Sequence, residues 1–515
     1  MHMASNHIRV MFDSFRAASA VSTSSPTRVS RYVFGCGLVF ACVLVGLMVA
    51  VLPYWFVIAV AVVPIFFLLV AWRIEYGVLA VLALVSGILH EAFLPSLSFL
   101  RAGDLSFFAV VAITIASGYT LSKGFQRSEL KLWIPVVAFL LLVPVSVVHA
   151  YFLLGVSPKD VFGEGRHLMF LLLFPLTVAV LNTKERVRRF ILGLLLLGVL
   201  FSLGQIVQSF FHVRIFGDSG RLVIAQTLDV KSYDATISNT GGLNIIILVL
   251  FTSAGWYVLK EIKTFKFLSL SAVCAVGILL TFGRTTWGVT LLGLVVVTHL
   301  LGLRKSGPML VWSLVGSSLA LALLIAFKPA MLDALVVRAT SVEKEIEYGS
   351  SAAWRYYEAE QVLPQIAANP VLGLGLGAAY RRPARSDALP EQVRYIHNGY
   401  LYMASKLGVP ALALVVWGVG MILKWSWRGA RTEQDPRSRG VHAAICAGVL
   451  GVLLASITEP HLMRDSSLAF LGVLAGLTVA LQRHARMPAP SGNEARATAS
   501  VGAVPLHVMA KAERV

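Results

Sequence analysis

Long stretches free of Asp, Glu, Lys and Arg constrain the fold of this chain more than any other feature. Five of them occupy residues 32–52, 56–72, 132–154, 190–211 and 311–327. An α-helix needs about 17–25 predominantly apolar residues to cross the hydrocarbon core of a bilayer, and these stretches approach or exceed that length. A bilayer core offers no water to satisfy backbone polar groups, so a spanning segment of this kind has to be helical. The sequence therefore predicts an all-α, polytopic integral membrane protein.

The composition agrees with a membrane protein and excludes several other classes. Hydrophobic residues make up 57% of the chain and charged residues only 14%, with a mean hydropathy of +0.78, whereas soluble domains average about 25% charged residues. The formal net charge is +18, but the basic residues lie in short turns, which indicates membrane topology and no nucleic-acid partner. The four cysteines all fall within apolar stretches without paired spacing. We expect neither disulfides nor a metal site.

Breaking the chain at charge clusters and Gly/Pro turns predicts about 14 transmembrane helices, with 12 or 13 as alternatives. Residues 1–31 form a cytoplasmic tail, 32–327 contain helices 1–11, 328–396 form one large loop, 397–483 contain helices 12–14, and 484–515 form a second tail that we expect to be disordered. The predicted spans are 32–52, 54–72, 77–95, 104–121, 132–152, 166–182, 190–211, 237–259, 267–283, 286–303, 309–327, 395–423, 441–458 and 466–482.

The distribution of basic residues gives an orientation. With the N-terminus in the cytoplasm, the basic turns at 123–131, 184–189, 260–266, 304–305 and 424–439 all face the cytoplasm, as the positive-inside rule requires. The 212–236 turn is also basic but faces outward, and long loops translocate largely regardless of charge. Both termini are then cytoplasmic, and the 328–396 loop is periplasmic.

The large loop contains two recognisable segments. Ser350 or Ser351 can cap a helix that runs to Pro364 or to the Asn369-Pro370 pair. A glycine-rich run, N-P-V-L-G-L-G-L-G, follows at residues 369–377. Phosphate-binding glycine loops follow a strand and open a helix, and no strand is predicted here. We therefore expect a flexible connector.

Counting spans brings four cationic side chains to the outer membrane face. Arg284 ends a span that travels outward, Arg166 and His397 begin spans that travel inward, and Arg355 lies in the loop. Arginine donates paired hydrogen bonds to phosphate, and histidine exchanges protons near neutral pH. This combination favours a site for a lipid pyrophosphate donor. The alternative is that the arginines anchor lipid phosphates and that the histidine is structural.

Three segments resemble the O-antigen ligase and O-antigen polymerase superfamily of bacterial envelope glycosyltransferases. The first is T-F-G-R-T-T-W-G at 281–288, and the second is the stretch from Trp354 through the glycine run to Gly377. The third is His397-Asn398, followed by nine residues and then G-V-P-A at 408–411. Ala411 stands where the ligases have a glycine, which is a departure from the pattern. Residues 235–425 carry the resemblance, and the remainder matches by hydropathy alone.

The resemblance implies metal-independent, inverting transfer of a glycan from undecaprenyl pyrophosphate to a sugar hydroxyl at the periplasmic face of the bacterial inner membrane. It implies no cofactor. His397 resembles the general base and Arg284 the ligand of the leaving pyrophosphate, while Arg355, Arg166 and Asn398 resemble residues that bind the donor or its glycan. The implied acceptor is a glycan or the lipid A-core, and membrane lipids surround the protein.

Two other functions are compatible with the same patterns. A protein O-oligosaccharyltransferase shares the fold and the donor but glycosylates Ser or Thr. A polysaccharide or lipid transporter would use charged residues near the bilayer midplane, and would be expected to show repeated halves. The last outer turn carries Glu459, His461, Arg464 and Asp465, which could line the entrance for the acceptor, but we expect an ordinary solvated turn.

Overall fold

The computed structural model describes residues 73–88, 101–116, 129–211, 240–327, 351–381 and 392–486, together with a few single positions. The N-terminal tail, the span predicted at 32–52, nearly all of 54–72 and of the 212–236 turn, and the tail beyond residue 486 lie outside the described residues. The described part is helical apart from one antiparallel pair, β1 (Tyr380–Arg381) and β2 (Gln392–Val393). An all-α fold is therefore confirmed.

Seven helices of the described part are long and apolar enough to cross a membrane. They are Leu130–Leu153 (α6, Leu130–Val148, with the π-helical η3, His149–Leu153), Pro158–Val180 (α7, Pro158–Leu168; η4, Met169–Leu172; α8, Leu173–Val180), α9 (Lys184–Phe211), α12 (Arg284–Leu301), α17 (Val409–Thr432), α18 (Pro436–Ala455) and Asp465–Ala485 within α19 (Asp465–Arg486).

Further helices complete the bundle. Four shorter apolar helices are α4 (Ile74–Val85), α5 (Ala102–Ala116), α10 (Thr240–Val258) and α11 (Thr264–Leu279). A longer helix, α13, spans Leu303–Phe327. The remainder are α15 (Ser351–Ala368), α16 (Gly399–Leu407) and the short η7 (His461–Met463). The chain is thus a multi-pass helical membrane protein.

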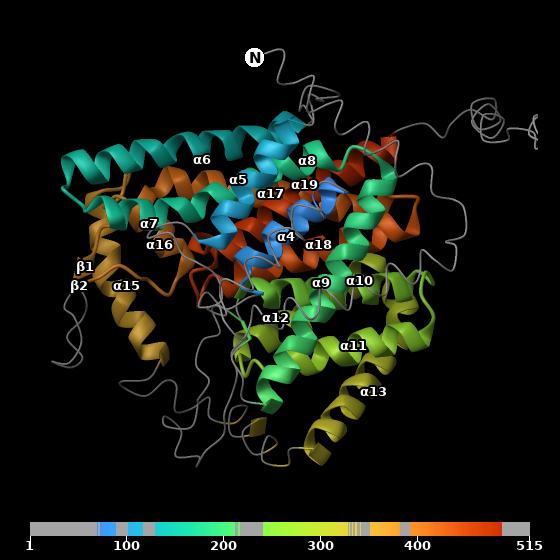
Figure 1. The fold of residues 1–515 in the computed structure, drawn as a ribbon. Coiled ribbons are helices and arrows are strands. Elements are labelled where there is room, and N and C mark those ends of the chain that lie inside the picture. The colour runs from blue at the N-terminus through green and yellow to red at the C-terminus, as the bar shows by residue number, and fades with distance from the viewer. Residues whose placement is uncertain are drawn as a thin grey trace, which may run out of the picture.

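The helices separate into a central and a peripheral set. The spanning segment of α19 is 89% buried and that of α18 is 72% buried, whereas that of α6 is only 17% buried. Figure 1 shows α6 along one edge of the bundle, with α18 and α19 inside it. Helix α6 also has exposed apolar side chains, among them Leu141 and Val148. This is the pattern expected where the surrounding solvent is hydrocarbon.

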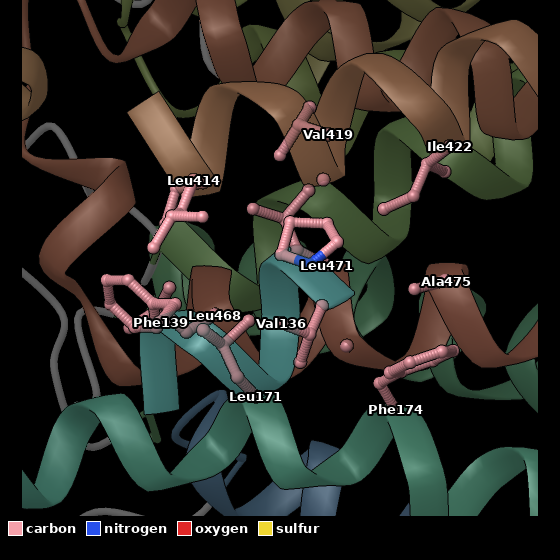
Figure 2. Close-up of a pocket in the computed structure, with 14 residues that line it drawn as sticks. Val136, Phe139, Leu171, Phe174, Leu414, Val419, Ile422, Leu468, Leu471 and Ala475 are labelled. Atoms are coloured by element: carbon pink, nitrogen blue, oxygen red, sulfur yellow. The ribbon is translucent and has the colours of Figure 1, made fainter. Parts of the chain in front are cut away.

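An apolar cavity lies between α6, α8, α17 and α19 (Figure 2). It is lined by Pro135, Val136, Phe139, Leu171, Phe174, Leu414, Val415, Gly418, Val419, Ile422, Leu468, Leu471, Gly472 and Ala475. This lining contains no charged or hydrogen-bonding side chain. The cavity therefore offers a polar ligand no side-chain hydrogen bond.

Three predicted span boundaries are wrong. Helix α4 ends at Val85, inside the span predicted at 77–95. The span predicted at 395–423 is split, because the backbone turns at Gly408 (φ 85°) and separates α16 from α17. The membrane-spanning helix is therefore Val409–Thr432, with Pro410 in its first turn. Arg284 does not end the preceding span, since α11 stops at Leu279 and Arg284 is the first residue of α12.

The loop helix is confirmed, whereas the flexible connector is wrong. Helix α15 runs from Ser351 through Pro364 and ends just before Asn369-Pro370. In the glycine run, Gly373, Gly375 and Gly377 all have positive φ, between 66° and 80°. A Cβ atom on Gly373 would lie 2.5 Å from the carbonyl oxygen of Ser405, and one on Gly377 would lie 2.7 Å from backbone atoms of Asp160. The glycine run therefore packs its backbone directly against the backbone of other segments.

The same packing explains Gly408. The amide of Val409 donates to the carbonyl of Pro370 (2.8 Å), and the amide of Leu374 donates to that of Ser405 (2.6 Å). A Cβ on Gly408 would lie 2.0 Å from the carbonyl oxygen of Val371. Glycine at this position therefore lets the end of the loop dock directly on the junction between α16 and α17.

Replacing Gly408 with alanine should destabilise the protein. The positive φ alone costs about 1–3 kcal/mol for a residue with a side chain, and the clash with Val371 adds to it. We expect a clear fall in the midpoint of thermal unfolding of the purified protein. Gly420→Ala in α17 is the matched control, because a Cβ there meets nothing within 4 Å. Equal midpoints for the two variants would contradict the packing described here.

Candidate functional site

Helix α15 presents a buried carboxylate to His397. Glu358 is 2% exposed, and both of its oxygens lie 3.3 Å from Nδ1 of His397. The backbone amide of His397 donates to the same carboxylate (2.8 Å), and the hydroxyl of Tyr380 donates to it as well (2.7 Å). An ionised carboxylate only accepts hydrogen bonds, so Nδ1 carries the proton and Nε2 of a neutral ring is left with its lone pair.

The chain around His397 is fixed on both sides. Asn398 follows directly and is the N-cap of α16, with Oδ1 accepting from the amides of Tyr400 (3.0 Å) and Leu401 (3.1 Å). Gly399 donates its amide to the carbonyl of Ser456 (2.7 Å), which ties the start of α16 to the end of α18. His397 therefore has a defined position, with 31% of its side chain exposed.

Tyr395 packs edge-on against His397, with the ring centroids 4.9 Å apart. Its hydroxyl donates to Glu459 (3.2 Å) and accepts from Arg464 (3.0 Å). Partial burial raises the pKa of Tyr395 to about 12, so the hydroxyl stays protonated at neutral pH. One face of the histidine thus borders an aromatic ring held by two charged side chains.

Arg355 and the first turn of α12, which begins at Arg284, approach the same turn after α18. Arg355, three residues before Glu358 on α15, donates from Nε to the carbonyl of Thr458 (3.0 Å), and its Nη2 lies 3.7 Å from Glu459. The hydroxyl of Thr285, next to Arg284, lies 3.3 Å from the hydroxyl of Thr458. The structure therefore brings the first turn of α12, the loop helix α15 and His397 to one place.

Arg166 and Asn398 have contacts that account for them structurally. Nη1 of Arg166 lies 2.9 Å from Asp104 of α5, whose side chain is 3% exposed. That pair ties α7 to α5, while Asn398 caps α16. Among the predicted site residues, Arg355 and His397 thus lie near the turn after α18, and Arg284 begins the helix whose first turn reaches it, whereas Arg166 is engaged with α5.

A buried lysine forms an ion pair next to the site. Lys406 of α16 is 1% exposed, and its ammonium lies 3.2 Å from Glu164 of α7 and also donates to the carbonyl of Ala378. Glu164 accepts in addition from the Tyr402 hydroxyl (3.0 Å) and from the Gly377 amide (2.7 Å). A buried charge needs such partners. This one group joins α7, the glycine run and α16. Figure 1 shows α7, α15, α16 and the two strands together at one end of the bundle.

Four residues of the site were not among the predicted site residues: Glu358, Tyr395, Glu459 and Arg464, the last two from the turn that was expected to be an ordinary solvated one. Only Glu358 had a usable signal, because residues three apart on a helix share a face and Glu358 lies three after Arg355. The other three lie in irregular segments that pattern reasoning does not place. Among the described residues, no group of three or more His, Cys, Asp or Glu side chains is arranged to hold a metal ion.

Comparison with known proteins identifies the region that contains this site. No curated protein gives a match to the chain. A family model described as O-antigen ligase matches residues 267–416, a range that includes Arg284, Arg355, Glu358 and His397. The resemblance predicted from three short segments is thereby confirmed, since all three lie within the residues that match this family model.

Proposed function

We propose that this protein is a glycosyltransferase of the bacterial inner membrane, which transfers or polymerises a glycan from undecaprenyl pyrophosphate onto a sugar hydroxyl at the periplasmic face. The observation that carries the proposal is the Glu358–His397 pair beside Arg355 and the start of α12. A base with a buried orienting carboxylate, close to cations, is the arrangement that such a transfer requires.

In the proposed reaction His397 is the general base. Glu358 holds the Nδ1 proton, and Nε2 removes the proton from the acceptor hydroxyl. The acceptor oxygen attacks the anomeric carbon from the face opposite the leaving group, so the new glycosidic bond forms as the bond to pyrophosphate breaks. The configuration at that carbon inverts. Glu358 stabilises the imidazolium that results, and no metal ion takes part in these steps.

The arginines are proposed to stabilise the leaving group. Negative charge grows on the pyrophosphate as the bond to the sugar breaks, and preformed cations lower the energy of that transition state. Arg284 occupies the first turn of α12, where the helix dipole adds positive potential. Nε of Arg355 is fixed on the Thr458 carbonyl, and its Nη2 lies 3.7 Å from Glu459, so the guanidinium is held next to the base.

Topology and partners follow from the same proposal. The chain would have about 14 spans with both termini cytoplasmic, and the 328–396 loop would fold over the periplasmic face as the lid of the site. The donor would be the lipid-linked glycan, and the acceptor a glycan or the lipid A-core. No cofactor is proposed. A protein acceptor would change only the last substrate and not the chemistry at His397.

The place of the charged residues relative to the candidate spans favours an enzyme over a transporter. Arg355 and His397 lie on α15 and just before α16, both outside the candidate membrane spans. Arg284 is the first residue of its span. A transporter would place such groups near the bilayer midplane along a path open to both sides. Charges at the end of the spans instead suit a substrate whose headgroup lies at the membrane surface.

His397→Ala should abolish glycan transfer, because the acceptor hydroxyl loses its base. Membrane insertion and expression should remain at wild-type levels. The measurement is a gel of envelope glycans from a deletion strain that carries the variant. Full-length chains without attachment to the lipid core would indicate a ligase, and single repeat units a polymerase. Normal glycans in the variant strain would remove His397 from the mechanism.

Glu358→Gln should lower kcat by about 10²–10⁴-fold, the usual contribution of a properly oriented general base. The glutamine keeps the shape, but its NH2 group can donate to Nδ1 and so favour the wrong tautomer of His397. The KM for the donor should change little, since the arginines are untouched. Glu360→Gln on the exposed side of the same helix is the control. A variant with wild-type kcat would show that His397 needs no orienting carboxylate.

Arg284→Lys should reduce kcat/KM by about tenfold or more, because an ammonium cannot reproduce two parallel hydrogen bonds, each worth about 1.5–3 kcal/mol to a charged group. Transfer assays with purified donor and acceptor give the comparison. Arg304→Lys, an exposed residue in the first turn of α13, is the matched control. If Arg284→Lys transferred at the wild-type rate, Arg284 would be an anchor for lipid phosphates.

A further inference from the structure

One carboxylate lies between two arginines beside the proposed base. Oε1 of Glu459 is 3.7 Å from Nη2 of Arg355, and Oε2 is 3.2 Å from Nη2 of Arg464. The three residues come from separate places: α15, the turn after α18, and the link between η7 and α19. All three side chains are partly exposed, at 28%, 30% and 37% for Arg355, Arg464 and Glu459. A small anion can therefore reach them.

The two arginines are preorganised by neutral partners as well. Nε of Arg355 is fixed on the Thr458 carbonyl, and Nη2 of Arg464 donates to the Tyr395 hydroxyl (3.0 Å). These bonds would persist if Glu459 moved away. Ion pairs between partly exposed side chains contribute little to stability. Displacing the carboxylate is therefore cheap, while the arginines keep their positions.

The charge balance of the group favours a stronger anion than a carboxylate. Two guanidinium groups share the one carboxylate of Glu459, each with a different oxygen. A diphosphate offers more negative charge and more acceptor oxygens than Glu459, and arginine forks bind phosphate in a bidentate manner. An incoming diphosphate can thus outcompete the internal carboxylate at both arginines.

We propose that Arg464 is a further ligand for the pyrophosphate of the donor, and that Glu459 is an internal anion that holds Arg355 and Arg464 until pyrophosphate displaces it. The inference rests on the proposed function, which supplies the sugar-linked diphosphate as substrate. Arg464 would complete the set begun by Arg284 and Arg355. Because Tyr395 bonds both Arg464 and Glu459 and packs on His397, the exchange of anions takes place next to the base.

The test measures binding of inorganic pyrophosphate to the full-length protein in nanodiscs of zwitterionic phosphatidylcholine. Arg464→Gln should weaken binding by about tenfold or more, since one charged ligand is lost. Glu459→Gln should tighten binding by about threefold or more, because the competing charge is gone. Arg437→Gln is the matched control, as Arg437 pairs with Glu261 (2.7 Å) at the start of α18, away from the site.

The direction of the Glu459→Gln effect separates this proposal from a purely structural role. If Glu459 merely braced the arginines, its loss would weaken pyrophosphate binding and lower the midpoint of thermal unfolding, and the proposal would be overturned. Arg464→Gln binding within twofold of wild type would overturn it too. A repeat in phosphatidylglycerol nanodiscs tests the source of the phosphate. Loss of the Arg464-dependent binding there would assign the site to lipid headgroups, against the proposal.

Transfer assays on the same variants distinguish failure of this inference from failure of the proposed function. Wild-type protein that binds pyrophosphate through Arg464 but transfers no glycan would refute the glycosyltransferase and leave the anion site standing. Wild-type protein that transfers glycan, with Arg464→Gln unchanged in both binding and donor KM, would refute only the role of Arg464. A raised donor KM in Arg464→Gln, with tighter pyrophosphate binding in Glu459→Gln, supports both.

Discussion

The buried pair of Lys406 and Glu164 is the interaction on which the arrangement of the site depends. An ammonium that is 1% exposed is tolerated only if paired and fully hydrogen-bonded, and here Glu164 and the Ala378 carbonyl supply those partners. Glu164 also receives Tyr402 and the Gly377 amide. The need to pair the buried ammonium of Lys406 therefore holds α7, the glycine run and α16 together. His397 lies two residues before α16.

Other buried carboxylates of the described part fix helices in the same way. Glu75 binds Arg189 at 2.7 Å, Glu129 binds Arg483 at 2.6 Å, and Asp104 binds Arg166 at 2.9 Å, with each acid at most 5% exposed. In each pair the base is an arginine, which is never neutral in proteins. Glu358 is equally buried, but its partner is a histidine that can gain and lose a proton. A buried carboxylate that fixes a helix elsewhere is here paired with a side chain of the type that can exchange protons.

The sequence alone predicts the spans of this protein better than the details of its site. Apolar length and charged turns are local signals, so the helices, the multi-pass class and the loop helix from Ser351 could all be found. The partner of His397 is 39 residues away, and that of Arg166 is 62 residues away. Contacts at such separations depend on how the helices pack, which no local pattern encodes.

The glycine run at 369–377 also depends on contacts with distant segments, which its own sequence does not reveal. Its spacing suggested a connector, because glycine permits flexibility as readily as it permits close contact. What distinguishes the two is the backbone on the opposite side, here Ser405 and Asp160, and that backbone is distant in sequence. The sequence marks Gly408 only by its spacing from His397. The structural reason for the glycine is Val371, whose backbone occupies the space that a side chain at position 408 would need.

A site that binds a diphosphate has to hold several arginines together before the ligand arrives. Like charges at close range repel, and near a membrane they are screened less than in bulk water. Glu459 relieves that repulsion with a carboxylate that is 37% exposed and so remains displaceable. Glu358 is buried and is not displaceable, which suits a residue that has to hold His397 throughout a reaction. The different burial of these two glutamates thus matches the different roles proposed for them, one leaving as the donor binds and the other staying.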